Sequence, residues 1–286
     1  MDGKPPQKQL EIQPGIIGID PSLKCSVVIR QDASAGALVC YPKNEAEAKA
    51  RQARKQYGRR CHLANPAYFD PNFKGKKPKW VVTKGMQAAL DIIQEAHRVA
   101  QAQQAQAVVQ IFQFLCRMGN EWYIEEHGTK GWQMGWFGRN SQRYAPGKIL
   151  DAIVRKAENA GIIVHKVPAR KAKLSQSCIT TTQTHKKPLS QRVHSLTING
   201  QTHQQSRDLW AAWLATLWTG DSLHRAQGLA LYPTAGPQML AMSESLYQQA
   251  TKANHPVQSL FCHQTTESLA KNASNPPKVT LFCPQK

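Results

Sequence analysis

The chain has 286 residues, and its 37 Lys and Arg exceed its 18 Asp and Glu to give a formal net charge of +19. That excess favours a polyanionic partner, with nucleic acid as the first candidate and an anionic membrane surface as the alternative. The sequence shows no apolar run long enough to span a bilayer and no signal peptide, and seven scattered cysteines without a C-x-x-C pair favour a reduced, cytoplasmic protein.

The N-terminal part of the chain predicts a lead-in followed by three strands. Residues 1–15 are polar and are expected to be unstructured. Short strands are predicted at 16–20, 25–31 and 36–41, because β-branched runs alternate there with turn residues. Their close spacing favours antiparallel neighbours. The first strand ends on a carboxylate, Asp20.

A basic segment follows and predicts a long helical insertion over residues 43–118. Between Lys43 and Lys79 there are eleven Lys and Arg against three acidic residues. We expect a basic helix, then a Pro- and Gly-broken loop, then an Ala- and Gln-rich helix over residues 84–118. A run of charged residues is most often a solvent-exposed face. In this segment most of the charges are positive and aromatic residues lie among them, which favours a nucleic-acid-binding surface.

The rest of the chain predicts a strand, a helix, a strand and a final helix. Glu125 and Glu126 end the strand that begins near residue 120, and Asp208 lies in the first turn of the final helix. Between Glu158 and Asp208 there are eight Lys and Arg and no acidic residue, which marks a second basic block. Residues 221–286 are rich in Pro, Ser and Gln and are expected to form a poorly structured tail.

Three carboxylates could meet at one edge of a mixed sheet built from these elements. Asp20 and Glu125 follow strands, and Asp208 begins a helix. Clustered carboxylates repel one another, and Mg²⁺, which prefers oxygen ligands, relieves the repulsion. Two such ions, about 3.5–4 Å apart, support phosphodiester hydrolysis. Taken singly, each carboxylate is better explained as a turn residue or a helix-dipole partner.

An ordered set of motifs resembles the TnpB/OrfB proteins of insertion sequences, relatives of the type V CRISPR effectors. The motifs are "GIDPSL", "NPAYFDPNFKGKKPKW", "EEHGTKGWQMGWFGRNSQRYAPGKIL", "KAENAGIIVHKVP", "KLSQSC", "KKPLSQRVH" and "SRDLWAAWLA". They cover about residues 16–217, and their order is more specific than any one of them.

The resemblance implies an α/β fold with an RNase H-like, RuvC-type mixed sheet flanked by helices over residues 16–220. It implies a transposon-associated, Mg²⁺-dependent endonuclease that cuts DNA selected by a guide RNA, in the cytoplasm and at the nucleoid. Asp20, Glu125 and Asp208 match the family's catalytic and metal-binding carboxylates, with two Mg²⁺ ions expected. Glu125 is preferred to Glu126 because it stands seven residues before Trp132, as the family pattern requires.

The chain departs from the family pattern in two regions. Family members carry a nucleic-acid-binding region ahead of the first catalytic strand, so the chain is expected to be truncated at its N-terminus or to rely on a partner chain. The zinc knuckle expected within residues 174–205 keeps only Cys178, with His185, His194 and His203 nearby. Their spacing fits no standard zinc pattern, so we expect no zinc.

The expected partners are a guide RNA and DNA rather than a membrane. The residues predicted to contact nucleic acid are Arg51, Arg54, Lys55, Arg59, Arg60, Lys76, Lys77, Lys79, Arg139, Lys171, Lys173, Lys186, Lys187 and Arg192. A catalytically inactive nucleic-acid-binding remnant, or a partner-dependent subunit, is the alternative. A Holliday-junction resolvase is disfavoured, because the insertion and the "KLSQSC" to "KKPLSQR" segment do not belong to that family.

Overall fold

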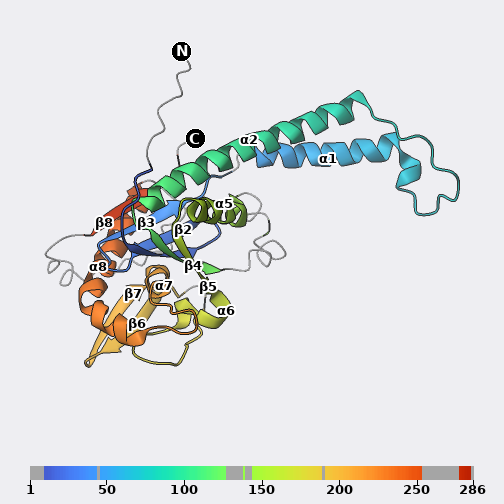
Figure 1. Cartoon of the computed structure of the whole chain (residues 1–286). Helices are drawn as coiled ribbons and strands as arrows, with labels where there is room; N and C mark the ends of the chain where they lie inside the picture. The colour runs from blue at the N-terminus through green and yellow to red at the C-terminus, as the bar shows by residue number, and fades with distance from the viewer. Residues whose placement is uncertain are drawn as a thin grey trace, which may run out of the picture. The chain divides into compact units, whose positions relative to one another are not determined.

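A six-stranded mixed sheet is the centre of the larger of two structural units (Figure 1). The computed structural model describes residues 10–43, 46–126, 138, 144–188, 191–252 and 277–284. The first unit comprises Met1–Tyr41 and Ala107–Gln285, and the second comprises Pro42–Gln106. The predicted insertion therefore begins where the second unit begins, but its last residues, from Ala107 onward, belong to the first unit.

The sheet combines an antiparallel meander with parallel strands. Strands β1 (Ile16–Pro21), β2 (Cys25–Arg30) and β3 (Ala35–Cys40) pair antiparallel in sequence order, as predicted. Strand β4 (Glu121–Glu126) is parallel to β1, and β5 (Ile163–Pro168) is parallel to β4. With β8 (Lys278–Phe282) parallel to β3, the strand order is β5-β4-β1-β2-β3-β8.

Helices cover both faces of the sheet because its strands carry apolar residues on both sides. On one face, the end of α2 (Lys84–Cys116) and α5 (Pro146–Asn159) form a core with Ile17, Ile19 and Trp122. On the other face, α7 (Arg207–Ala215) and α8 (Arg225–Lys252) form a core with Val27 and Ile29. Alternate residues of a strand point to opposite faces, so β1 presents Gly18 and Asp20 to the α7 side.

Helix α8 and strand β8 correct the prediction of a poorly structured tail over residues 221–286 for residues 225–252 and 278–282, while residues 253–276 of that prediction lie outside the described residues. Helix α8 buries Tyr232, Met239, Met242 and Leu246 in the core that it shares with α7. Strand β8 extends the sheet beyond β3. The Pro and Ser content suggested a tail because Pro233 and Pro237 lie inside α8, yet tertiary burial stabilises the helix despite them.

Short elements connect β5 to α7. Helix α6 (Ala169–Ala172) and the 3₁₀ turn Leu174–Gln176 follow β5 directly. Strands β6 (Val193–Ile198) and β7 (Gln201–Ser206) then form an antiparallel hairpin. Asn199 and Gly200 both have positive φ angles, 51° and 76°, which suits a tight two-residue hairpin turn.

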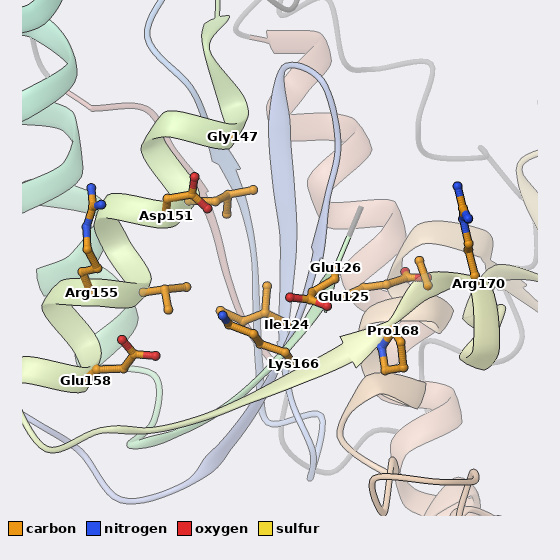
Figure 2. A pocket seen from close by; sticks show the side chains of 13 residues that line it. Ile124, Glu125, Glu126, Gly147, Asp151, Arg155, Glu158, Lys166, Pro168 and Arg170 are labelled. Atoms are coloured by element: carbon orange, nitrogen blue, oxygen red, sulfur yellow. The ribbon is translucent and has the colours of Figure 1, made fainter. Parts of the chain in front are cut away.

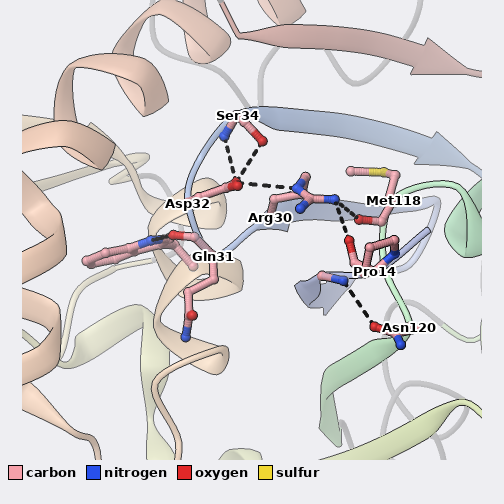
Figure 3. Close-up of polar contacts among 9 residues, drawn as sticks. Pro14, Arg30, Gln31, Asp32, Ser34, Met118 and Asn120 are labelled. Atoms are coloured by element: carbon pink, nitrogen blue, oxygen red, sulfur yellow. Dashed lines mark hydrogen bonds and ion pairs between the residues drawn. The ribbon is translucent and has the colours of Figure 1, made fainter.

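A polar network closes the end of the sheet where β1 begins (Figure 3). Arg30 donates from Nη1 to the carbonyl oxygens of Met118 at 2.7 Å and Pro14 at 3.3 Å. Its Nε lies 3.4 Å from Asp32, whose carboxylate also accepts from Ser34. These bonds lower the pKa of Asp32 against the opposing effect of its partial burial. The network anchors the chain ahead of β1, at the end remote from Asp20.

The second unit contains α1 (Glu47–Ala64), the 3₁₀ turn Pro66–Tyr68 and the first part of α2. Side-chain contacts join its helices, among them Arg54 with His97 at 3.2 Å and Arg60 with the carbonyl oxygen of Gly85. Its buried apolar side chains among the described residues are small or slender, and they are Ala50, Ala53, Cys61, Met86, Ala89, Ala96 and Ala100. None of the helices in the described ranges has the length and apolar character that a membrane span requires.

Candidate functional site

Asp20 and Glu125 lie side by side at the ends of two adjacent parallel strands. The register pairs Ile19 of β1 with Ile124 of β4, so the next positions along both strands are Asp20 and Glu125. Ile19 and Ile124 both point into the core beneath α2 and α5. Asp20 and Glu125 therefore point to the opposite face, which α7 covers.

Asp208 reaches the same place from α7. A Cβ at Gly18 would fall 1.8 Å from the carbonyl oxygen of Ala212, so α7 lies directly on β1 at that point. Asp208 is one helical turn before Ala212, which places it over the end of β1. Because Gly18 has no side chain, α7 packs closely against β1, and this packing brings the carboxylate of Asp208 to Asp20.

The charges of Asp208 and Asp20 interact. Burial, and next the negative charge of Asp20, raise the pKa of Asp208 to about 6. The side chain of Asp208 is 13% exposed. An acid with a pKa displaced by burial and a neighbouring carboxylate is a common feature of functional sites, although structural ion-pair networks also produce such shifts.

Two guanidinium groups offset the charge of Asp208. Nη1 of Arg192 lies 3.6 Å from Oδ2, and Nε of Arg207 lies 3.2 Å from Oδ1. Arg207 is itself oriented, because its Nη1 donates to the carbonyl oxygen of Gln191 at 3.1 Å. Arg192 is among the residues predicted to contact nucleic acid, whereas Arg207 is not, although the position of Arg207 directly before the predicted carboxylate was a usable signal.

Cys25 forms part of the floor of this site. Burial above all raises the pKa of its thiol to about 12, and the charges of Asp208 and Asp20 act in the same direction. Ser22 Oγ lies 3.3 Å from the sulfur and donates to the Cys25 carbonyl oxygen at 2.9 Å. The thiol remains protonated at neutral pH, so it is a packing group and not a nucleophile.

Glu125 also borders an open pocket of about 700 Å³ on the α5 side of β4 (Figure 2). Glu125 is 5% exposed, whereas its neighbour Glu126 is exposed. The pocket carries charges of both signs, from Glu126, Asp151, Arg155, Glu158, Lys166 and Arg170. Asp20 and Asp208 are not among its lining residues, so this pocket is distinct from the place where those two carboxylates meet.

The donor types fit a hard divalent cation, but the carboxylates are not gathered into a finished metal site. Among the described residues, no three His, Cys, Asp or Glu side chains are grouped closely enough to hold a metal ion. Asp20, Glu125 and Asp208 nonetheless lie on one face of the sheet at one end of β1 and β4. Oxygen ligands of this kind are those that Mg²⁺ prefers.

The predicted nucleic-acid contacts in the second unit are mainly exposed. Arg51, Arg54, Lys55 and Arg59 lie exposed on α1, and Lys76, Lys77 and Lys79 lie exposed in the loop before α2. Arg60 differs, because its guanidinium donates to the carbonyl oxygen of Gly85 and is only partly exposed. That contact gives Arg60 a structural role in joining α1 to α2.

The predicted contacts in the first unit have more varied surroundings. Lys171, Lys173 and Lys186 are exposed, and Lys171 Nζ lies 2.7 Å from Asp221. Lys187 is half-buried and donates to Nδ1 of His194, so it also has a structural role. Arg139 lies outside the described residues.

The region predicted as a degenerate zinc knuckle, residues 174–205, contains the β6–β7 hairpin. His194 is 2% exposed and stacks on Trp210 with ring centroids 4.7 Å apart. His203 contacts the ring of Tyr232 edge-on at 5.5 Å. His185 is exposed, and Cys178 is buried beside Thr180. Aromatic packing and hydrogen bonds therefore hold the side chains of His194, His203 and Cys178 in place.

The comparisons with known proteins add no family assignment. No protein-family model matches the chain, and no curated protein matches its sequence.

Proposed function

We propose that this chain is a TnpB-like, transposon-associated protein that cleaves DNA phosphodiester bonds with Mg²⁺ at a site chosen by a guide RNA. The observation that carries the proposal is the meeting of Asp20 and Asp208. They come from opposite ends of the motif series, yet the charge of one raises the pKa of the other. The sequence resemblance independently matches both positions to the family's catalytic carboxylates.

The topology supports an RNase H-like assignment for the first unit. Its sheet begins with the antiparallel strands β1, β2 and β3 and continues with β4 and β5 parallel to β1. Helices lie on both faces. This arrangement explains how residues at the end of β1, the end of β4 and the start of the last motif helix share one edge.

The chain's own residues have distinct roles in this proposal. Asp20, Glu125 and Asp208 would hold the cation, which when bound supplies an activated water and stabilises the leaving oxygen. Arg207, oriented by Gln191, keeps the Asp208 carboxylate in position. Arg192, partly exposed beside Asp208, offers a positive charge to a phosphate at the edge of the site.

A non-catalytic nucleic-acid-binding remnant is the second candidate. The observation that favours it is the pairing of Asp208 with two arginines, together with the lack of a gathered metal-ligand group among the described residues. In this case the exposed basic residues would bind nucleic acid while the carboxylates serve only in internal ion pairs.

The deciding experiment measures cleavage of single-stranded and supercoiled DNA by the purified chain with Mg²⁺ and with a chelator. The first proposal expects Mg²⁺-dependent nicking that Asp20→Ala and Asp208→Asn abolish. Asp151→Asn, an exposed carboxylate on α5, is the matched control and should leave cleavage unchanged. Cleavage that survives Asp20→Ala would come from a contaminant. Absence of cleavage, with a heterogeneous mixture of copurifying RNAs instead of one defined RNA, would favour the remnant.

A further inference from the structure

The loop that joins α1 to α2 carries aromatic rings that its own fold does not bury. Phe69 is 41% exposed and Phe73 is 38% exposed. Side chains of this type are usually removed from water in a folded protein. Contiguous exposed apolar patches that are rimmed by polar residues can mark interaction sites.

Four of the rings form a connected cluster, consisting of His62, Tyr68, Phe69 and Trp80. His62 and Phe69 are stacked, with centroids 3.7 Å apart and planes inclined by 23°. Trp80 contacts Tyr68 edge-on at 5.0 Å and Phe69 at 6.1 Å. This aromatic cluster joins the end of α1 to both ends of the loop.

Hydrogen bonds at the base of the loop hold the aromatic cluster in place. Asn65 is buried, and its side-chain amide both donates to the Val81 carbonyl oxygen at 2.9 Å and accepts from the Val81 amide at 2.7 Å. The Tyr68 hydroxyl donates to the carbonyl oxygen of Pro78 at 2.7 Å. The rings are therefore positioned before any ligand binds, which reduces the entropy lost on binding.

The charge around the rings is strongly positive. Lys74, Lys76, Lys77 and Lys79 are all exposed, and Lys77 Nζ lies 5.2 Å from the centre of the Tyr68 ring. The single acidic residue between Pro66 and Trp80, Asp70, accepts a hydrogen bond from the Asn72 amide at 2.8 Å. Ammonium groups beside planar rings complement a ligand that presents phosphates and flat bases together.

We propose that this loop binds single-stranded nucleic acid by stacking unpaired bases on Phe69 and Phe73 while the lysines contact the flanking phosphates. Stacking on aromatic side chains is tolerant of sequence and contributes about 1–3 kcal/mol per base. The inference rests on the proposed function only for the class of ligand. It assigns a binding site in the second unit that does not involve the three carboxylates.

The test measures binding of the full chain to four labelled probes of equal length. They are a single-stranded RNA, the DNA of the same sequence, the corresponding duplex, and an abasic strand that keeps the phosphates. Phe73→Ala and Phe69→Leu should each weaken binding of both single strands roughly tenfold and leave binding of the abasic strand unchanged. Ile92→Ala, which removes a 46% exposed apolar side chain of α2, is the matched control and should change nothing.

Circular dichroism and thermal melting of each variant verify that the chain is folded. Phe73→Ala keeps the test decisive if Phe69→Leu disturbs the loop, because Phe73 lies outside the aromatic cluster. Equal losses for abasic and base-containing strands, or no loss for any probe, would overturn the inference. Binding to vesicles of anionic phospholipid is measured in parallel, and a loss of vesicle binding alone would also overturn the inference, because it would identify a membrane surface instead. Failure of the proposed function is separate, since it appears as absent Mg²⁺-dependent cleavage with base-dependent binding intact.

Discussion

Gly18 on β1 and Ala212 on α7 are in such close contact that a methyl group cannot be added between them. A Cβ at Gly18 would stand 1.8 Å from the Ala212 carbonyl oxygen and 2.9 Å from the Thr216 side chain. The first of these atoms belongs to the backbone of a buried helix, which cannot move aside without disturbing its core. This contact sets the distance of Asp208 from the sheet.

Gly18→Ala is therefore expected to destabilise the first unit by about 3 kcal/mol, because α7 must lift from β1. The same shift should separate Asp208 from Asp20 and reduce any metal-dependent activity. Urea unfolding measures the stability change. Gly58→Ala is the control: beyond the adjoining backbone of α1, no atom lies within 4 Å of the added Cβ, so helix propensity should make this change stabilising by about 0.5–1 kcal/mol. Similar behaviour of the two variants would contradict the assignment of Gly18 as a packing contact.

The interaction between the two aspartates can be measured directly. In Asp20→Asn, the pKa of Asp208 should fall below its value of about 6, because a negative neighbour that disfavours ionisation has been removed. In Arg192→Gln the same pKa should rise, because a positive neighbour that favours ionisation has been removed. Carboxyl-carbon NMR titration of Asp208 reports both shifts. An unchanged titration in Asp20→Asn would show that the two side chains do not interact.

The buried imidazole of His194 should make stability depend on pH. Burial first, and then the charges of Lys187 and His185, lower its pKa to about 3 from an unfolded value of about 6.5. Below about pH 6.5, His194 is protonated in the unfolded chain but stays neutral in the folded chain. The free energy of unfolding therefore falls as the pH falls, by up to about 1.4 kcal/mol per pH unit until about pH 3.

His194→Phe keeps a ring against Trp210 and removes this titration. Urea unfolding between about pH 7 and about pH 4 should therefore give a flatter stability profile for the variant than for the wild type. Leu63→Ala, a change at an exposed, non-titrating position of α1, should keep the wild-type slope. Parallel profiles for His194→Phe and wild type would mean that the folded protein tolerates a charged His194.

Helix α8 should contribute strongly to the stability of the first unit. Met242 is fully buried, and its sulfur lies 2.4 Å from where a Cβ at Gly36 of β3 would be. Met242→Ala should cost about 2–5 kcal/mol through lost burial and a residual cavity. Leu229→Ala, a change at a 40% exposed position of the same helix, should cost under about 0.5 kcal/mol. Thermal melting of the two variants distinguishes a packed helix from a dispensable tail.

The sequence by itself determined the strands of the meander, the basic helix and loop, α5 and α7. Each has a strong local signal, such as a β-branched run bounded by turn residues, or a periodic apolar face with Pro146 at the start and Gly161 after the end. The ordered motifs also selected Asp20 and Asp208. For Glu125 and Glu126, strand alternation in the structure directs Glu125 to the face that α7 covers.

Only the tertiary structure decided how those elements and charges are used. Local composition did not predict the helix at residues 225–252 or the strand at residues 278–282. These elements are stabilised by burial against α7 and by pairing with β3, which composition does not report. Lys187 and Arg60 are predicted from the sequence to contact nucleic acid, yet Lys187 donates to His194 and Arg60 donates to the carbonyl oxygen of Gly85. The closeness of Asp208 to Asp20 likewise depends on a missing side chain at Gly18, a condition set by three-dimensional packing and not by local sequence.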